Sequence, residues 1–527
     1  EVSFKSTEYL LGEAMDFPFD NLGNDYLGLG ATPSRVESSY SEKTLLSFFA
    51  RGNYNYDNRY LFTATVRADG STVFSNKNKW GFFPSFSAAW RVSEEAFMES
   101  TRSWLDNLKV RASYGILGNQ LLTASSWSGN TKYYPYIPFM ASGTAGNWLF
   151  VDGEKSLYIN PAGLVSSDLT WEKASTFNIG LDFTMLNQRL DFSFDWYQRT
   201  TSDMLVKVEY PEVLGTTAPP ANKAELRTRG WEVSVKWNDR IGNDFSYDLG
   251  FILSDSQAEI TKYENPSGTL SDYYVGQKIG EIWGYRVDGF FATDEEAKNY
   301  EVDQRSVNTT INSSSGEYRG VRAGDLKYRD LDGNKTISIG ENRVGSSGDR
   351  EILGNSSPRY QYGTNLAFQW YGFDFNIFFQ GIGHIDWYPG REAQAFWGYY
   401  NRPYGTFIPK DFQKLCWSED NPNAYFPRPR TAVALTENSE LSTVNDRYLQ
   451  NIGYCRLKNL TIGYSLPKFL TNKIGLDLVR LYFSGENLAY WSPIKTDYVD
   501  PEQARQGGTL KVYPWQKSFT FGVNINF

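Results

Sequence analysis

The sequence contains very little of the side-chain chemistry on which most enzymes and metalloproteins depend. Among 527 residues there is one histidine, His384, and there are two cysteines, Cys416 and Cys455. A single imidazole argues against histidine-based metal sites and His-dependent catalysis, and the two cysteines, far apart in sequence, indicate free thiols rather than a disulfide framework. We find no nucleophile–base arrangement, phosphate-binding loop or zinc spacing, so the sequence predicts a protein that is not an enzyme.

Positive charge and long apolar runs are also scarce. The net charge is −9 and the pI is near 5.1. Nucleic acid is therefore not expected as a partner, because phosphate binding needs a concentrated basic surface. No run reaches the roughly 18 apolar residues that a membrane-spanning helix requires.

Aromatic residues, by contrast, are abundant. They make up 17% of the chain, yet the mean hydropathy is −0.49. A transmembrane β-barrel combines these properties, because half of each strand faces water. A secreted aromatic-rich, glycan-binding β protein combines them too, so composition leaves both open.

Alternation of apolar and polar residues predicts about 14 β-strands. In one hairpin, Phe177, Ile179 and Leu181 alternate with Asn178, Gly180 and Asp182, and a turn at Asn187-Gln188 leads into a second alternating stretch from Leu190. The polar face of this hairpin carries Asp182, Asp191 and Asp195. A dry sandwich core would not accept these charges, whereas a water-filled barrel lumen would.

The expected connections alternate between short and long. The short ones fall near 55–59, 93–106, 186–189, 238–243, 371–372 and 466–475, and the long ones at 10–41, 118–171, 204–222, 258–355, 385–446 and 488–514. Outer-membrane barrels sort their connections in this way, with short periplasmic turns and long extracellular loops. The final strand, SFTFGVNINF, then ends on the periplasmic side. In YCRLKNLTIGY (454–464), Arg456 and Lys458 share the apolar parity, which indicates either a bulge or a strand end above the membrane.

Several segments resemble one family, the SusC-like TonB-dependent outer-membrane transporters of Bacteroidetes. The resemblance covers nearly the whole chain, in the family's order: RYLFTATVRADGSTVFSNKNKWGFFPSFSAAWRVSEEAFM (59–98), LKVRASYGILGNQ (108–120), LTWEKASTFNIGLDFTMLNQRLDFSFDWYQRTTSDML (169–205), VGQKIGEIWGYRVDGFF (275–291), GDLKYRDLDGNKTI (324–337), YCRLKNLTIGYSLP (454–467) and GENLAYWSPIKTDYVDPE (485–502).

This resemblance implies a nutrient importer rather than an enzyme. It implies TonB-dependent, energy-driven uptake of oligosaccharides or peptides, captured with a SusD-like lid lipoprotein at the cell surface. Besides the secreted glycan-binding protein, a barrel for adhesion or secretion without import remains an alternative.

The family comparison also predicts that residues 1–527 are the C-terminal part of a larger barrel. Members carry a signal peptide, a TonB box and a plug domain before the barrel, and none of these is recognisable here. Large plugged barrels have about 22 strands. We therefore expect the plug domain and the first strands to lie elsewhere on the same gene product or on a second chain, because free strand edges in lipid are prohibitively costly.

One loop has the spacing of a calcium site. In DLDGNKTISIGE, oxygen ligands fall at positions 1, 3, 5, 7, 9 and 12, but Lys335 occupies the glycine position. A plain Asx/Gly turn is the alternative, and no cofactor is otherwise expected. The candidate ligands are Asp330, Asp332, Asn334, Thr336, Ser338 and Glu341.

Loop aromatics are the candidate substrate contacts, because flat sugar faces, peptides and aromatic ligands stack on such rings. The alternative is that they pack the loops together or contact a lid protein. The candidates are Trp127, Trp148, Trp283, Trp387, Trp397, Tyr399 and Tyr400, with Phe396 and Trp417 in the same loops. On the lumen face, Arg67, Lys109, Arg111, Asp248 and Arg480, with the three aspartates above, are expected to line a polar path or anchor the plug.

Overall fold

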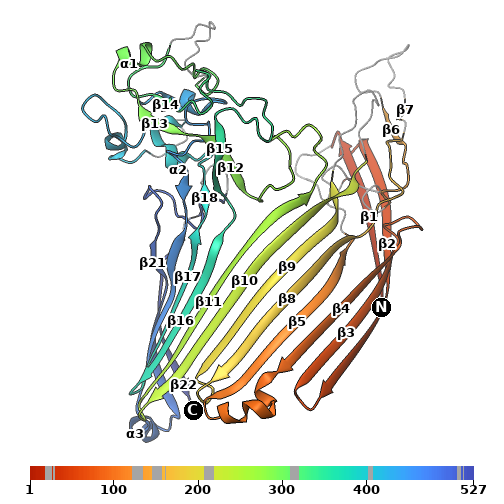
Figure 1. Ribbon diagram of the computed structural model, residues 1–527, viewed down its shortest axis with the longest axis vertical. Helices are drawn as coiled ribbons and strands as arrows, with labels where there is room; N and C mark the ends of the chain where they lie inside the picture. The colour runs from red at the N-terminus through yellow and green to blue at the C-terminus, as the bar shows by residue number, and fades with distance from the viewer. Residues whose placement is uncertain are drawn as a thin grey trace.

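The computed structural model describes residues 1–17, 27, 30–120, 134–144, 157–160, 162–206, 219–308, 320–401, 408–506, 512–513 and 515–527. Most of them form one curved antiparallel sheet of 14 strands (Figure 1), which confirms the predicted all-β fold. In sheet order the strands are β1 (Val2–Met15), β2 (Thr32–Tyr56), β3 (Tyr60–Ser71), β4 (Trp80–Arg91), β5 (Leu105–Asn119), β8 (Glu172–Met185), β9 (Leu190–Val206), β10 (Ala221–Ile241), β11 (Phe245–Lys262), β16 (Arg359–Trp370), β17 (Phe373–His384), β20 (Tyr454–Ser465), β21 (Leu478–Trp491) and β22 (Ser518–Asn526).

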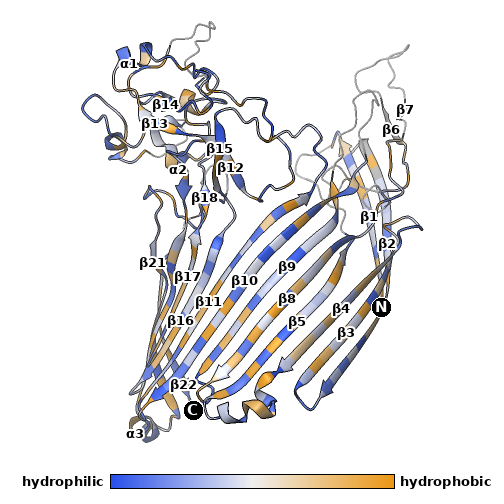
Figure 2. Cartoon of the chain, viewed as in Figure 1, coloured by the Kyte–Doolittle hydropathy of each residue, from blue (hydrophilic) through white to orange (hydrophobic). Residues whose placement is uncertain are grey.

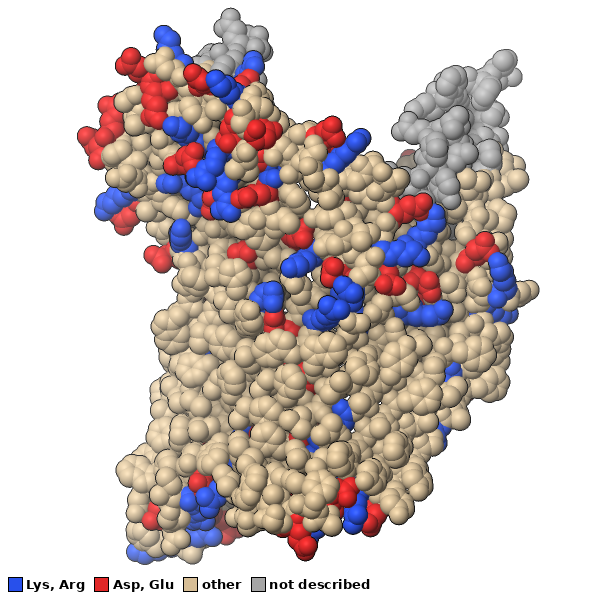
Figure 3. Space-filling model, viewed as in Figure 1, with Lys and Arg blue, Asp and Glu red and all other residues tan. Residues whose placement is uncertain are grey.

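The two faces of the sheet differ in polarity, because the register places like side chains in rows. Leu181, Phe194 and Val233 lie opposite one another across β8, β9 and β10. Asp182 and Ser193 form the next pair, on the other face. Figure 2 shows the resulting alternation along the strands, and Figure 3 shows an outer face with few charged residues between the upper loops and the lower turns.

The strands are joined by short turns at one end of the sheet and by longer segments at the other, as predicted. Asn187 and Gln188 adopt positive φ in the turn between β8 and β9, and Tyr371 and Gly372 do so between β16 and β17. Such left-handed pairs match the twist of hairpin strands. The last strand, β22, ends at the short-turn end of the sheet, where Asn526 pairs with the start of β21.

The structure differs from the expected loops at two places. Residues 10–41 were expected to be a loop, but β1 extends to Met15 and β2 begins at Thr32. Twelve consecutive residues of β1 pair without a shift, from Val2 opposite Leu46 to Glu13 opposite Arg35, although the stretch has little alternation of polarity. A further connection, between β3 and β4, was not predicted as a separate loop.

The anomalous segment 454–464 contains a β-bulge. Leu457 pairs with Phe379 and Asn459 with Phe378, so Lys458 is the extra residue. The shift moves Arg456 opposite Gln380, on the polar face of β17. The structure therefore confirms the bulge.

Four small ladders and two short α-helices lie in the long connections, and a third short α-helix lies in the turn between β20 and β21. The ladders pair β6 (Ala141–Thr144) with β7 (Leu157–Asn160), β12 (Glu281–Tyr285) with β15 (Arg350–Asn355), β13 (Val287–Phe290) with β14 (Leu326–Tyr328), and β18 (Asp386–Trp387) with β19 (Gln450–Asn451). The α-helices are α1 (Asp294–Lys298), α2 (Gln394–Trp397) and α3 (Lys468–Thr471). None of the helices within the described ranges has the length and apolar character to cross a bilayer.

Candidate functional site: the polar face and the loop domain

An ion-pair network crosses three strands on the polar face of the sheet. Arg111 of β5 donates to Asp182 of β8 at 3.0 and 2.9 Å, and to both carboxylate oxygens of Asp195 of β9 at 2.6 Å. Lys109 lies 2.8 Å from the same Asp182 carboxylate. These four predicted lumen residues are therefore brought together, and their charges balance.

A glycine between the partners makes this reach possible. Gly180 lies directly opposite both Arg111 and Asp195, and a Cβ at this position would overlap the Arg111 guanidinium. The same device recurs at Gly463, where Arg480 reaches Asp374 across β20. A glycine inside a strand signals the close approach of another group, so the sequence held this information, although the prediction did not use it.

The other predicted lumen charges are held by local partners. Arg67 donates to both oxygens of Asp69 at 2.9 Å. Asp191 accepts a hydrogen bond of 2.8 Å from Thr184. Asp248 lies opposite Asn238 in the register. On the polar face, Arg67, Lys109, Arg111 and Arg480 are thus each paired with a carboxylate.

The loop aromatics form a compact core. It lies within the long connections drawn above β16 and β17 at the upper left of Figure 1. Trp397 and Tyr400 are completely buried, and the Trp397 indole donates to the Gly390 carbonyl at 3.0 Å. Trp387 and Tyr399 pack against the same core. For Trp397 and Tyr400 the structure favours the packing alternative, because neither ring offers a surface to a ligand. Buried members of this loop core include Tyr285, Leu326, Tyr328, Phe396, Trp397, Tyr400, Phe412, Phe426, Leu441 and Tyr448.

Two buried carboxyl groups lie beneath this core. Asp325 receives two hydrogen bonds from Arg430, at 2.7 and 2.6 Å. Glu440 is also fully buried, and its Oε1 accepts from the amide of Leu326 at 2.5 Å. Burial, reinforced by the nearby Asp325 charge, raises the pKa of Glu440 well above its usual value.

A cavity of about 690 Å³ opens beside the loop core, where the two longest connections meet. We call it the loop pocket; its lining includes Trp283, Tyr285, Arg350, Arg391, Ser442 and Thr443. Burial raises the pKa of Tyr285 to about 12, so its hydroxyl stays protonated. The Arg391 side chain is 58% exposed. The pocket combines aromatic rings, hydroxyls, two arginines and one carboxylate, that of Glu437. Because the arginines outnumber the carboxylate, the lining suits a ligand with an apolar part and a carboxylate.

Of the predicted substrate contacts, Trp283 is the one that lines the loop pocket, and Trp127 and Trp148 lie outside the described residues. The sequence analysis missed Tyr285, Arg350 and Arg391. Tyr285 could have been predicted from the sequence, because it lies two residues after Trp283, a spacing that places both side chains on one face of a strand.

The predicted calcium loop brings together two of its six candidates and one further residue. Carboxylate oxygens of Asp330, Asp332 and Asp349 lie within 4.8 Å of one another. Glu341 lies outside this group, with its carboxylate 3.7 Å from Arg343. Asn334, Thr336 and Ser338 take part in tight local hydrogen bonds; for example, the Thr336 amide donates to Asn334 Oδ1 at 2.7 Å. The calcium site stays a prediction.

The few thiols and the imidazole have the surroundings expected of them. Cys416 is a buried free thiol and Cys455 a partly exposed one. His384 ends β17 with its Nε2 3.0 Å from Asp386, and its side chain is 47% exposed.

Comparison with known proteins agrees with this architecture. Residues 3–488 match the family described as TonB dependent receptor-like, beta-barrel. The chain is 29% identical over 526 residues to TonB-dependent receptor P3 of Formosa agariphila, covering 94% of the chain and 47% of the relative. It is 29% identical over 504 residues to TonB-dependent receptor SusC of Bacteroides thetaiotaomicron, covering 94% of the chain and 45% of the relative. The chain thus spans about half the length of these relatives.

The solved structures include the RagAB peptide transporter. The superposition has a TM-score of 0.68 at 22% identity and covers all of this chain and 55% of the other. That likeness shows the same fold. TonB-dependent receptors are outer-membrane transporters, so the predictions of a non-enzymatic protein and of the outer membrane are confirmed. The sheet, its charge-paired inner face and the family match lead to one conclusion: the chain belongs to the TonB-dependent receptor β-barrel family.

Proposed function

We propose that the chain forms part of the barrel of an energy-driven importer for oligosaccharides or peptides. The observation that carries this proposal is the family match over residues 3–488, on a sheet with one apolar and one charge-paired face. An apolar outer face suits lipid, and a polar inner face suits a hydrated path for solutes. The barrel contributes walls and loops to transport, not bond-breaking chemistry.

Further strands close this barrel in the proposal. Within the described residues, the sheet ends at β1 on one side and at β22 on the other. Unpaired backbone groups in hydrocarbon cost several kcal/mol each. We therefore assign the closing strands and a plug domain to a part of the gene product, or of a second chain, outside residues 1–527. About 22 strands in total match a large plugged transporter, and the greater length of the relatives supports this assignment.

The orientation follows from the two kinds of connection. We place the short turns and the C-terminus in the periplasm and the loop domain outside the cell, as is general for bacterial outer-membrane barrels. The loop core and the loop pocket then face the medium from which nutrients arrive. The polar network around Arg111 lies deeper, on the wall that a plug would contact.

The loop pocket is the proposed first contact for substrate. Trp283 supplies a half-buried ring and Arg391 an exposed guanidinium, so a peptide with a free carboxylate and an acidic oligosaccharide both suit the lining. The structural neighbour RagAB is named a peptide transporter, which supports the peptide alternative. The relatives include TonB-dependent receptor SusC, and we propose that a SusD-like lipoprotein closes over the loop domain.

In this mechanism ligand is trapped between the lid and the lumen, and TonB then displaces the plug from the periplasmic side. In this proposal TonB acts on the periplasmic side of the full-length protein, and the lid binds its loop domain. The ion pairs around Arg111 link neighbouring strands, so they stabilise the wall past which the ligand moves.

Affinity purification of the full-length gene product from its native membrane tests this proposal. We expect a lipoprotein to co-purify, and we expect a deletion strain to lose growth on one peptide or oligosaccharide source. The variants Trp283→Ala and Arg391→Ala should weaken uptake of that source, while Tyr498→Ala, at a ring that is 41% exposed and outside the pocket lining, should not. Unchanged uptake of every nutrient in the deletion strain would contradict import and favour adhesion or secretion.

A further inference from the structure

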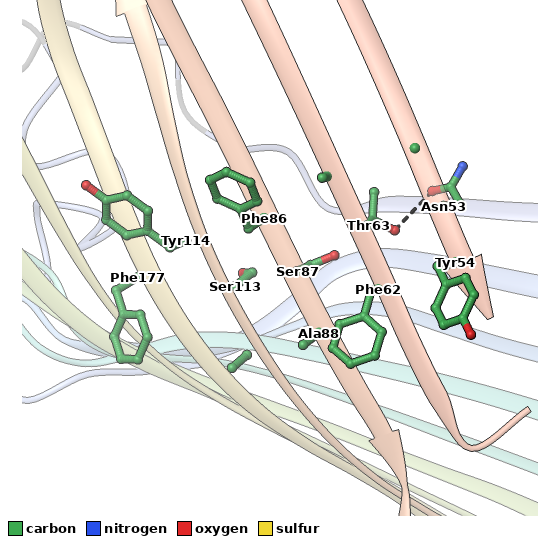
Figure 4. Close-up of a pocket in the computed structure, with 13 residues that line it drawn as sticks. Asn53, Tyr54, Phe62, Thr63, Phe86, Ser87, Ala88, Ser113, Tyr114 and Phe177 are labelled. Atoms are coloured by element: carbon green, nitrogen blue, oxygen red, sulfur yellow. Dashed lines mark hydrogen bonds between the residues drawn. The ribbon is translucent and has the colours of Figure 1, made fainter. Parts of the chain in front are cut away.

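The apolar face carries a shallow furrow of about 560 Å³ that crosses β2, β3, β4 and β5 and ends at β8 (Figure 4). Its floor is made of residues with little or no side chain, namely Gly52, Ala64, Ala88 and Ala112. Its walls are aromatic rings, namely Tyr54, Phe62, Phe86, Tyr114 and Phe177. All nine residues occupy positions on the outer, apolar face of the sheet.

The register explains why the small residues make a continuous floor. Gly52 lies directly opposite Ala64, and Ala88 lies directly opposite Ala112. The second pair is offset from the first by two residues, because Ala64 lies opposite Phe86. The floor therefore runs diagonally across the strands, with aromatic rings on both sides.

The lining rings remain exposed in the structure. Phe62, Phe86 and Tyr114 are 49%, 52% and 43% exposed, respectively. On a face turned to lipid, a groove of this shape must be filled by something apolar, since an empty groove forfeits dispersion contacts along both walls.

A more polar row of outward side chains borders the furrow on the side of the short turns. This row lies two residues along the strands from Phe62 and Ala88, which is about 7 Å. There the rings of Tyr60 and Trp90 stack at 6.5 Å, and both donate to Glu95, at 2.6 and 2.9 Å. Aromatic residues anchored by polar groups in this way are typical of the edge of the hydrocarbon layer.

A cluster of mixed charge follows at the turn between β2 and β3 and at the end of β4. Arg59 lies 3.2 Å from Asp57 and 3.7 Å from Glu95. This guanidinium and its two carboxylates carry a formal charge of −1, and the side chains of Arg59 and Asp57 are 36% and 63% exposed. Arg91 lies opposite Lys109, so its side chain belongs to the polar face instead.

From this arrangement we propose that the furrow is a binding site for a zwitterionic glycerophospholipid of the leaflet on the short-turn side. One acyl chain lies in the furrow, the phosphate faces Arg59, and the headgroup ammonium faces Asp57. A zwitterion suits this cluster better than an anionic lipid, which would add negative charge to a group that is already negative. A protein strand is a poorer occupant, because the face of a sheet offers no free backbone hydrogen bonds.

The inference rests on the proposed barrel, which turns this face towards lipid. Its test uses the full-length protein, purified in mild detergent from nanodiscs that contain equal amounts of phosphatidylethanolamine and phosphatidylglycerol, with bound lipid measured by native mass spectrometry. We expect one retained phosphatidylethanolamine per barrel. Filling the floor with Ala88→Leu and Ala112→Leu should reduce that occupancy by about tenfold.

The matched control is Ala68→Leu, on the same face of β3 but outside the furrow, and it should leave the lipid in place. Replacing Arg59 by glutamine should abolish the preference for phosphatidylethanolamine. Equal retention by the filled and control variants, a preference for phosphatidylglycerol, or a second protein copy in place of lipid would overturn the proposal. A protein that imports nutrients but retains no lipid contradicts the lipid site alone, whereas a protein absent from the membrane fraction contradicts the barrel as well.

Discussion

Because of the bulge in β20, the side chain of Arg456 lies on the polar face, and the free-energy cost of replacing it can be predicted. This side chain is only 2% exposed, and its Nη2 donates to both oxygens of Asp500, at 2.6 and 2.5 Å, while its Nε lies 2.9 Å from Glu502. The guanidinium also lies 4.9 Å from the centre of the Tyr490 ring. Arg456 therefore holds the connection between β21 and β22 against the polar face of the sheet.

Replacing Arg456 with methionine keeps most of the volume and removes the charge. Breaking a fully buried ion pair costs about 3–5 kcal/mol. The cost here should be lower, because the carboxylates of Asp500 and Glu502 are 20% and 17% exposed and Lys458 still lies 2.7 Å from Glu502. We expect about 2 kcal/mol, which corresponds to roughly a 30-fold increase in local opening of this segment.

Hydrogen exchange of the full-length protein in detergent measures this opening directly. The reporting amides are those of Glu502 and Gln503, which donate to Asp500. The control is Arg480→Met, which breaks a comparable pair on the same face and should leave these amides unchanged. An exchange rate that rises less than about twofold in Arg456→Met would refute the assigned role of the bulge.

Three further predictions concern the loop domain. Glu440→Gln should stabilise the loop domain at pH 7–8. The pKa of Glu440 is raised in the folded state, so its contribution to stability is complete below the pKa of the unfolded state and is lost as pH rises towards the folded-state pKa. The variant should therefore make hydrogen exchange of the Leu326 amide less dependent on pH. Trp397→Ala should cost about 3–5 kcal/mol through loss of a fully buried ring, seen as early protease cleavage of the loops in intact cells, and protection equal to that of the wild type would contradict a packing role. If the 330–341 loop binds calcium, terbium luminescence should appear at micromolar ion and vanish in Asp330→Asn, with a weaker loss in Asp349→Asn; no luminescence would leave a plain turn.

Local patterns in the sequence were sufficient to predict the sheet. Alternation in stretches such as 177–185 depends only on the two-residue period of a strand, and the turns at Asn187 and Gly372 depend on residues that tolerate positive φ. The division into short and long connections followed from these two signals. Long-range register was not needed for any of them.

The parts that were missed depend on pairing between distant segments. The extension of β1 and β2 past the expected loop boundary is determined by pairing with each other, not by alternation. The bulge at Lys458 was one of two alternatives until the register with β17 decided between them. In the same way, no spacing rule could bring Asp349 to Asp330 in place of Glu341, because a fold of the loop joins them.

The loop aromatics illustrate the same limit. Their abundance predicted either ligand stacking or packing, and only the tertiary structure shows that Trp397 and Tyr400 are buried while Trp283 reaches a cavity. Composition reports how many rings the loops contain. It does not report which of them have a free face.

The most direct test of the central claim is energised uptake. A strain that lacks the gene, complemented with the full-length product, would be supplied with labelled peptides and oligosaccharides, with and without a protonophore that dissipates the proton-motive force. We expect uptake of one class of nutrient to depend on the gene and to stop when the protonophore is added. Uptake that is independent of the gene, or that continues unchanged without proton-motive force, would contradict an energy-driven importer.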